Sequence, residues 1–388
     1  MYYMSTFQLY KTVIKQIDKY RKHCLWRGAD INAKNPPKDA WSMVCLPKKE
    51  GGLGVLNLKT QNEALLLKHL HKFYNRADIP WVHLIWEKHY NAEQLPDSRR
   101  KGSFWWKDIN KLLLSYKGLA MVHIYDGATC LFWEDLWNNR VPAQQFLELF
   151  SFAKKKNISI KTARNANGPE ALLHLPISDI PLQQLLILAN DLNNLQQTQD
   201  LDIWSYIWGS STFSISKAYV HLTGHCVTHA TFNWLWKSAC QKKHKVFFWL
   251  LLKDRLSTRE LLRRKNMILQ DYSCVLCPST SDESLEHLFI HCNFERACWA
   301  SIGLIVGNDG PYITLEHFKQ QLGVPFFMEI IILMSWCIWM QRNDLIFKGE
   351  QPSIDACYRH FKKEFALVIL RAKIRINPHI SSWLDTLV

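Results

Sequence analysis

Apolar positions recur with helical spacing over most of this 388-residue chain. In 5–27, apolar side chains return every three or four residues, with lysines and arginines between them. The same spacing marks 55–73, 104–113 and 182–195. These stretches predict helices that each bury one face, because residues three or four apart lie on the same side of a helix.

Two shorter stretches predict extended structure. The run 41–45 ends at the glycine-rich turn 51–54, and we expect it to be a short strand. The stretches 122–125 and 129–132 flank Asp126-Gly127, a dipeptide that favours a tight turn, so they predict a hairpin. The expected fold class is mainly α with short β hairpins.

The most apolar window, 324–340, carries Glu329 and is shorter than the ~20 residues that a bilayer requires. It predicts a buried helix and no membrane association. Met1–Ser5 lacks the basic and apolar regions of a secretory signal. We therefore expect a nuclear or cytoplasmic protein, not secreted, whose 11 cysteines are reduced thiols.

A helical hairpin is expected ahead of the cysteine-rich segment. Lysines bracket the apolar run 246–252, which predicts its first helix. Ser257 and Glu260 have the S-x-x-E spacing of a capping box, so the second helix should begin at Thr258. This second helix is basic.

Four metal-ligand residue types then fall within one short window. Cys274 and Cys277 form a C-x₂-C pair, and His287 and Cys292 form an H-x₄-C pair about one helical turn apart. Zn²⁺ takes four such ligands in a tetrahedron, and a site with no open position is structural. The sequence predicts a CCHC zinc knuckle with structural Zn²⁺; His291 remains an alternative to His287.

The charge balance points to a polyanionic partner. Lys and Arg number 48 against 34 acidic residues, a formal net charge of +14. Arg259 and Arg263 lie one helical turn apart and can contact successive phosphates, so we expect RNA or DNA binding with low sequence specificity and no small-molecule substrate. The predicted nucleic-acid-binding residues are Lys242, Lys243, Lys245, Arg259, Arg263, Arg264 and Lys265.

No catalytic residue is predicted. A polymerase needs paired carboxylates for two metal ions, and this sequence contains no Asp-Asp dipeptide. The nearest pair, Asp200 and Asp202, is expected in a loop with the character of a helix start. We therefore expect a protein that is not an enzyme.

Several segments in order resemble the reverse transcriptases of plant LINE-type (non-LTR) retrotransposons. They are Trp41 to Val55 with its Glu50-Gly51-Gly52-Leu53-Gly54 turn, Gly127-x₄-Phe132-Trp133-x-Asp135-x-Trp137, Asp202-x-Trp204, Lys243 to Leu250, the CCHC window, and Trp336-x₂-Trp339-x₂-Arg342-Asn343. The CCHC window resembles the reverse-transcriptase zinc-binding domain of that family, whose full-length members are RNA-directed DNA polymerases.

The resemblance implies the C-terminal part of such a protein, without the palm. It divides the chain into a thumb-like segment (1–96), a connector with a Trp-rich helix and hairpin (97–200), the zinc-binding domain (201–300) and a helical C-terminal region (301–388). The polar stretch 97–102 and the linker candidate 196–200 lie at these boundaries. The implied function is that of a zinc-binding, nucleic-acid-binding fragment. The alternatives are a zinc-stabilised protein–protein module and a decayed element.

Overall fold

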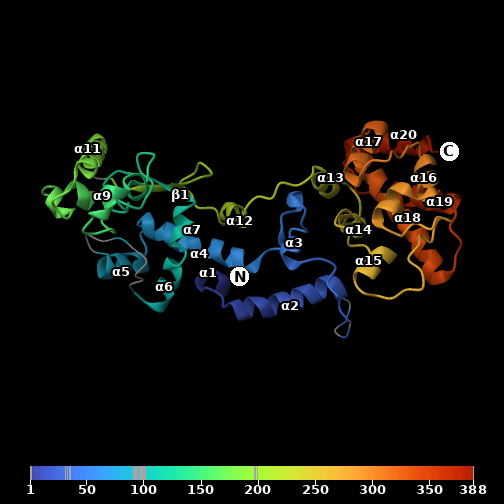
Figure 1. Ribbon diagram of the computed structural model, residues 1–388, viewed down its shortest axis with the longest axis horizontal. Coiled ribbons are helices and arrows are strands. Elements are labelled where there is room, and N and C mark those ends of the chain that lie inside the picture. The colour runs from blue at the N-terminus through green and yellow to red at the C-terminus, as the bar shows by residue number, and fades with distance from the viewer. Residues whose placement is uncertain are drawn as a thin grey trace. The chain divides into compact units, whose positions relative to one another are not determined.

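A computed structural model describes residues 2–30, 32, 34, 36–90, 95, 102–195, 198 and 200–387. This part of the chain is mainly helical with one two-stranded sheet, which confirms the expected fold class (Figure 1). The chain forms two compact units: unit 1 is Met1–Tyr20 with Leu56–His225, and unit 2 is Arg21–Val55 with Cys226–Val388. The predicted boundary 97–102 and linker 196–200 fall largely outside the described residues, and the four-segment division stays a prediction.

Unit 1 packs around α4, whose side chains contact α1, α6, α7 and α12. Aromatic rings dominate this core: Phe73 stacks on Trp86 with ring centroids 4.4 Å apart, and Tyr74 stacks on Tyr116 at 5.3 Å. Large aromatic side chains bury the most apolar area per residue, so few of them suffice to fix the short helices. The elements of unit 1 are α1 (Tyr2–Thr6), the first part of α2 (Lys11–Arg27), α4 (Leu58–Tyr74), α5 (Pro80–His89), α6 (Phe104–Asn110), α7 (Leu113–Lys117), β1 (Ala120–His123), α8 (Pro142–Gln145), α9 (Leu147–Ser151), α10 (Ile160–Arg164), η2 (Pro169–Ala171), α11 (Asp179–Asn194), β2 (Ile203–Tyr206) and α12 (Ile215–Thr223).

The helix predicted over 5–27 is wrong at its start, because the chain breaks between α1 and α2. The buried Asn62 of α4 causes this break. Its side chain accepts the N–H of Leu9 at 2.8 Å and donates to the carbonyls of Met4 at 2.6 Å and Phe7 at 2.9 Å. These bonds satisfy backbone groups that a continuous helix would have paired internally.

The predicted hairpin of 122–125 with 129–132 is also wrong. Strand β1 pairs antiparallel with β2, with Ala120 opposite Tyr206 and His123 opposite Ile203. Leu131 instead forms an isolated bridge with Ser159. The partner of β1 therefore lies more than seventy residues further along the chain. The Asp126-Gly127 turn does not connect two paired strands and has a different structural role.

That role is to wrap the turn around the buried carboxylate of Asp202. The N–H groups of Tyr125, Gly127 and Thr129 each donate to Asp202 at 2.9 Å. The Thr129 hydroxyl adds a fourth bond at 2.8 Å. Asp202 directly precedes β2, so its expected helix-start character is wrong. It instead anchors a turn by accepting donors that would otherwise be buried without partners.

Unit 2 packs around α18, which contacts α14, α16, α17 and α19 (Figure 1). With 22 residues, α18 extends beyond the apolar window 324–340 and is long and apolar enough to cross a membrane by length and composition. The length of the window therefore does not exclude a membrane span, contrary to the expectation from the sequence. However, 56% of its most apolar window is buried within the protein, as expected for the core helix that the sequence predicted. The elements of unit 2 are the remainder of α2, α3 (Trp41–Cys45), η1 (Lys48–Glu50), α13 (Thr231–Lys237), α14 (Lys242–Leu252), α15 (Arg259–Arg264), η3 (His287–His291), α16 (Asn293–Ala300), α17 (Pro311–Leu322), α18 (Phe327–Lys348), α19 (Ile354–Ala366), η4 (Ile374–Ile376) and α20 (Asn377–Asp385).

Two local predictions in unit 2 need correction. The run 41–45 forms the short helix α3 rather than a strand, because five residues are too few for periodicity to distinguish the two. The helix α15 is capped by Thr258, not Ser257: the Thr258 hydroxyl accepts the N–H of Leu261 at 3.3 Å. The two expected helices, α14 and α15, do follow one another directly ahead of the cysteine-rich segment. Their packing as a hairpin stays a prediction.

Candidate metal centre

A short β-like closure presents the first cysteine pair. Ser273 bridges Asp282, the N–H of Cys274 donates to Ser281 at 3.0 Å, and the N–H of Glu283 donates to Tyr272 at 2.8 Å. We call residues 272–283 the knuckle hairpin. Its loop carries Cys277 and Pro278, so the C-x₂-C pair lies where the backbone reverses direction and both sulfurs can reach the same point.

The second ligand pair lies on a π-helical turn, η3. The N–H of Cys292 donates to the carbonyl of His287 at 2.7 Å, a bond that spans five residues. An α-helix completes a turn in 3.6 residues, so five residues would overshoot and separate the two side chains. A π-turn closes over five residues, and such turns are frequent at functional sites. The H-x₄-C spacing therefore works through this rarer turn.

The four ligand atoms converge. The Sγ atoms of Cys274 and Cys292 lie 3.9 Å apart, and Cys277 Sγ lies 3.4 Å from His287 Nε2. All four atoms lie within 4.8 Å of one another. Tetrahedral Zn²⁺ would place two thiolates about 3.8 Å apart and a thiolate and an imidazole about 3.6 Å apart, from bond lengths of roughly 2.3 and 2.0 Å. The observed spacing fits such an ion, and the donor set is the soft one that zinc prefers.

His291 is directed elsewhere. Its Nε2 lies 3.6 Å from Glu286 Oε1, and its side chain is about one-third exposed. The structure thus gathers His287, the residue favoured by the sequence, with the three cysteines, and leaves the neighbouring histidine on the outer side of η3.

The environment of Cys292 lowers the pKa of its thiol. A hydrogen bond from the Cys274 thiol lowers the pKa of Cys292 to about 5, and the N–H groups of Glu295 and Phe294 at the start of α16 contribute to the shift. The same bond raises the pKa of Cys274. This shift favours the thiolate form of Cys292, and the thiolate is the form that binds metal ions.

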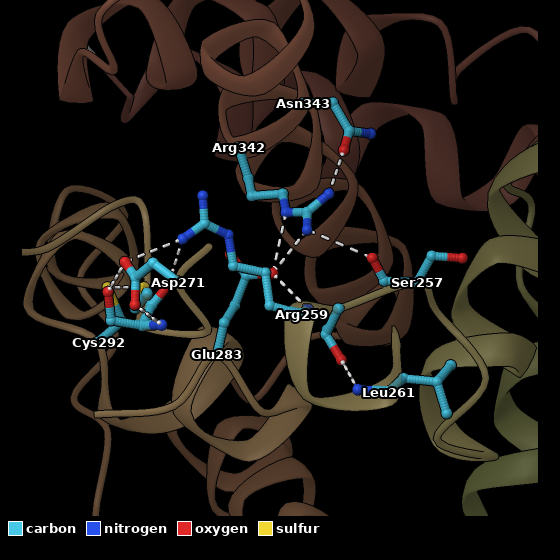
Figure 2. Close-up of polar contacts among 11 residues, drawn as sticks. Ser257, Arg259, Leu261, Asp271, Glu283, Cys292, Arg342 and Asn343 are labelled. Carbon is cyan, nitrogen blue, oxygen red and sulfur yellow. Dashed lines mark hydrogen bonds and ion pairs between the residues drawn. The ribbon is translucent and has the colours of Figure 1, made fainter. Parts of the chain in front are cut away.

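A buried ion pair connects the knuckle hairpin to the core of unit 2. Glu283 is fully buried, and its Oε1 accepts Arg342 Nη2 at 2.6 Å and the N–H of Arg259 at 3.1 Å. Figure 2 shows Arg342 reaching from α18, with Ser257 and Asn343 as its other partners at 3.3 and 3.0 Å. One guanidinium thus joins α18, the start of α15 and the knuckle hairpin.

Sequence reasoning did not identify Glu283. It lies in the polar run 279–284, which has no periodicity and no spacing typical of a site. Arg342 carried a signal, because it belongs to the Trp339-x₂-Arg342-Asn343 pattern, and its guanidinium does lie 4.8 Å from the Trp339 ring. A buried acid becomes recognisable only when the cation that balances it is found in the tertiary structure.

Two arginines of α15, Arg259 and Arg263, contact the knuckle hairpin. Arg259 bonds the carboxylate of Asp271 at 3.3 Å and the carbonyl of Ser273 at 3.0 Å (Figure 2). Arg263 pairs with Asp282 at 2.5 Å. Arg259 is only 23% exposed, whereas Arg263 is 48% exposed and remains accessible to a partner. Arg264 is similarly exposed and pairs with Asp254 at 2.5 Å.

Three of the predicted lysines, Lys242, Lys243 and Lys245, lie in the first turn of α14. They are about 10–15 Å along its axis from the turn toward α15. Lys243 pairs with Glu364 at 3.7 Å, and Lys245 donates to the carbonyls of Trp236 and Ser238. Burial lowers the pKa of Lys245. Lys242 and Lys265 are exposed. The seven predicted cations therefore have different neighbours and do not gather at one place, and their contact with nucleic acid stays a prediction.

Comparison with known proteins places this cluster in a recognised segment. Residues 213–299 match a family model described as zinc-binding in reverse transcriptase. This segment contains Cys274, Cys277, His287 and Cys292 together with α14 and α15.

A protein of Arabidopsis thaliana named "Putative ribonuclease H protein" is 27% identical over 391 aligned residues. The alignment covers 95% of this chain and 61% of that protein, so the chain spans about three-fifths of the length of the relative. The matched zinc-binding segment and this relative together support a retrotransposon-related protein with a Cys/His cluster suited to a metal ion.

Proposed function

We propose that this chain is the zinc-binding, nucleic-acid-binding region of a LINE-type retrotransposon reverse transcriptase, located C-terminal to the palm. The observation that carries the proposal is the convergence of Cys274, Cys277, His287 and Cys292, with all four ligand atoms within 4.8 Å. The match to the reverse-transcriptase zinc-binding family over 213–299 supports the same assignment.

Zn²⁺ bound there would be structural. Four protein ligands would fill its tetrahedron and leave no position for a substrate water. Bound metal would hold the knuckle hairpin against η3, and α15 would follow because Arg259 and Glu283 connect it to the hairpin. The free energy of metal binding would thus serve folding of this segment.

Nucleic acid is the partner we propose, bound through its backbone with low sequence specificity. The chain carries a net charge of +14, and the ion pairs of Arg263 and Arg264 are about half exposed on both partners. Surface pairs of this kind contribute only about 0–1 kcal/mol, so exchanging a carboxylate for a phosphate costs little. Phosphate contacts carry no sequence information.

We assign neither polymerase nor ribonuclease H activity to this chain. The Arabidopsis relative is named as a ribonuclease H protein, but it extends well beyond the matched region. In this chain, Asp202 uses both carboxylate oxygens to anchor the turn 125–129, so it is poorly placed to hold a catalytic metal ion. We propose that any catalysis resides in other parts of the longer proteins.

One experiment tests metal and partner together. Purified chain should contain one Zn²⁺ and bind DNA and RNA with an affinity that falls steeply as salt rises, by about −0.7 to −0.9 in log K per log salt for each phosphate contact. The Cys274→Ser, Cys277→Ser variant should lose the zinc and weaken binding. Cys226→Ser, an exposed cysteine outside the cluster, is the matched control and should change neither. If the double variant keeps its zinc, the proposed metal site is wrong. If binding to DNA and RNA does not depend on salt, the proposal that the chain binds the nucleic-acid backbone is wrong.

A further inference from the structure

The loop after α15 presents an aliphatic side chain to solvent. The helix ends at Arg264, and Asn266, two residues later, has a left-handed φ of +58°. The N–H of Met267 donates to the carbonyl of Leu262 at 3.0 Å. This is a Schellman-type ending, in which the residue at the position of Met267 commonly packs on the last turn. Met267 occupies this position and is 51% exposed. Ile268 follows it and is 95% exposed.

Tyr272 bonds the backbone on both sides of Ile268. The hydroxyl of Tyr272 donates to the carbonyl of Met267 at 2.9 Å and accepts the N–H of Leu269 at 3.2 Å, so one side chain fixes the backbone on both sides of Ile268. The guanidinium of Arg263 covers the Tyr272 ring at 5.1 Å. Tyr272 itself belongs to the knuckle hairpin. A backbone that is already ordered in this way loses little conformational entropy on binding.

Three cations directly precede this loop in the chain, and Asp271 follows it. Residues 262–270 contain Arg263, Arg264 and Lys265 and no acidic residue. In the described parts of the chain, Arg263 and Arg264 have exposed acidic partners and Lys265 forms no ion pair. Lys38 lies close enough that burial and the charge of Lys265 lower its pKa. An exposed aliphatic side chain beside several cations is complementary to a partner with an anionic surface and an apolar interior.

We infer that Ile268 is a wedge that enters between stacked base pairs of a nucleic-acid duplex, while Arg263, Arg264 and Lys265 contact the flanking phosphates. The inference rests on the proposed function and specifies how the partner is bound. Aliphatic side chains of proteins that bend DNA unstack a base step in this way. Isoleucine has no group that reads base edges, so the wedge should prefer only steps that open easily, such as TA.

An anionic membrane offers similar chemistry, but the observations favour a duplex. Membrane-surface segments bury a broad apolar face along a helix, whereas this loop offers one fully exposed aliphatic side chain. The loop also lies inside the segment 213–299 that matches the reverse-transcriptase zinc-binding family.

The test uses the zinc-loaded full chain and a short DNA duplex with 2-aminopurine at a central TA step. The parent protein should raise 2-aminopurine fluorescence as the base unstacks. Ile268→Ala should abolish this rise and weaken binding about tenfold. The loss of three buried carbons weakens binding, and this loss is partly offset because the variant no longer has to unstack the base step. Its salt slope should equal that of the parent, because no charge is removed. Ile305→Ala, at an isoleucine that is 78% exposed in another loop, is the matched control and should behave like the parent.

A second experiment tests the cations beside Ile268. Arg263→Gln with Lys265→Gln should flatten the salt slope by about one to two units. If the parent does not bind the duplex, the proposed function and the wedge both fail. If the parent binds with the expected salt dependence and Ile268→Ala matches it in affinity and fluorescence, only the wedge is overturned. Loss of binding to phosphatidylserine vesicles in Ile268→Ala, with duplex binding intact, would identify a membrane contact and also overturn it.

Discussion

Units 1 and 2 each contain an irregular segment that is held by polar groups, and they use different means. In unit 1, the turn 125–129 is anchored by the carboxylate of Asp202, which accepts three backbone N–H groups and one hydroxyl. In unit 2, the knuckle hairpin and η3 are joined by the cluster of three cysteines and His287, with the Glu283–Arg342 pair as a second tie. The first anchor is complete within the chain, whereas the second has room for an ion.

The difference concerns how much of each anchor the polypeptide supplies. A carboxylate that receives several backbone donors satisfies buried groups by itself. Thiols and an imidazole brought within 4.8 Å of one another attract each other weakly until a cation is shared among them. Segment 272–292 should therefore depend on solution conditions that leave segment 125–131 unaffected.

Metal removal should produce the largest effect. Chelation of Zn²⁺ should expose the backbone of 272–292, because structural zinc contributes about 10–16 kcal/mol in zinc-finger peptides. Amide hydrogen exchange followed by mass spectrometry should show faster exchange there and no change in 120–131. Equal protection of 272–292 before and after chelation would show that the anchors do not differ in this way.

The Glu283–Arg342 pair should rank second. Glu283→Gln leaves the guanidinium of Arg342 buried without its counter-charge, and breaking a buried pair costs about 3–5 kcal/mol. Urea denaturation of the zinc-loaded protein should report this loss, while the zinc content stays at one per chain. Glu286→Gln, an exposed acid of the same segment, is the control and should change stability by less than about 0.5 kcal/mol.

A double variant separates charge from packing. Glu283→Leu with Arg342→Met should be more stable than Glu283→Gln, because replacing both members of a buried pair by apolar groups is often neutral. If the double variant is the less stable of the two, Glu283 and Arg342 contribute to stability through their hydrogen bonds and packing, and not only by neutralising each other's charge.

Asp202→Asn should destabilise the protein less than chelation of Zn²⁺ or Glu283→Gln. The amide keeps the size of the side chain but offers one acceptor in place of two, so donors of Thr129 lose their partner at a cost of about 1–3 kcal/mol. Exchange should accelerate in 125–131 and remain unchanged in 272–292. The exposed Asp200→Asn is the matched control. Faster exchange in both segments would show that the two units are not independent in stability.

The sequence by itself determined the features that depend on near neighbours. Helical spacing predicted α4, α6 and α11, and two ligand pairs at metal-like spacing predicted the cluster of Cys274, Cys277, His287 and Cys292. Such signals are local: ligands within a few residues share a turn, and an apolar stripe follows from the period of the helix.

Only the tertiary structure decided the pairings between distant residues. Asn62 ends α1, Asp202 captures the turn that looked like a hairpin, and Glu283 meets Arg342 across 59 positions. Each contact joins groups that satisfy a buried donor or charge, and no spacing in the sequence records which distant group will serve. The π-turn at His287 is similar, because the spacing of its residues alone does not distinguish a five-residue closure from an ordinary α-helical turn.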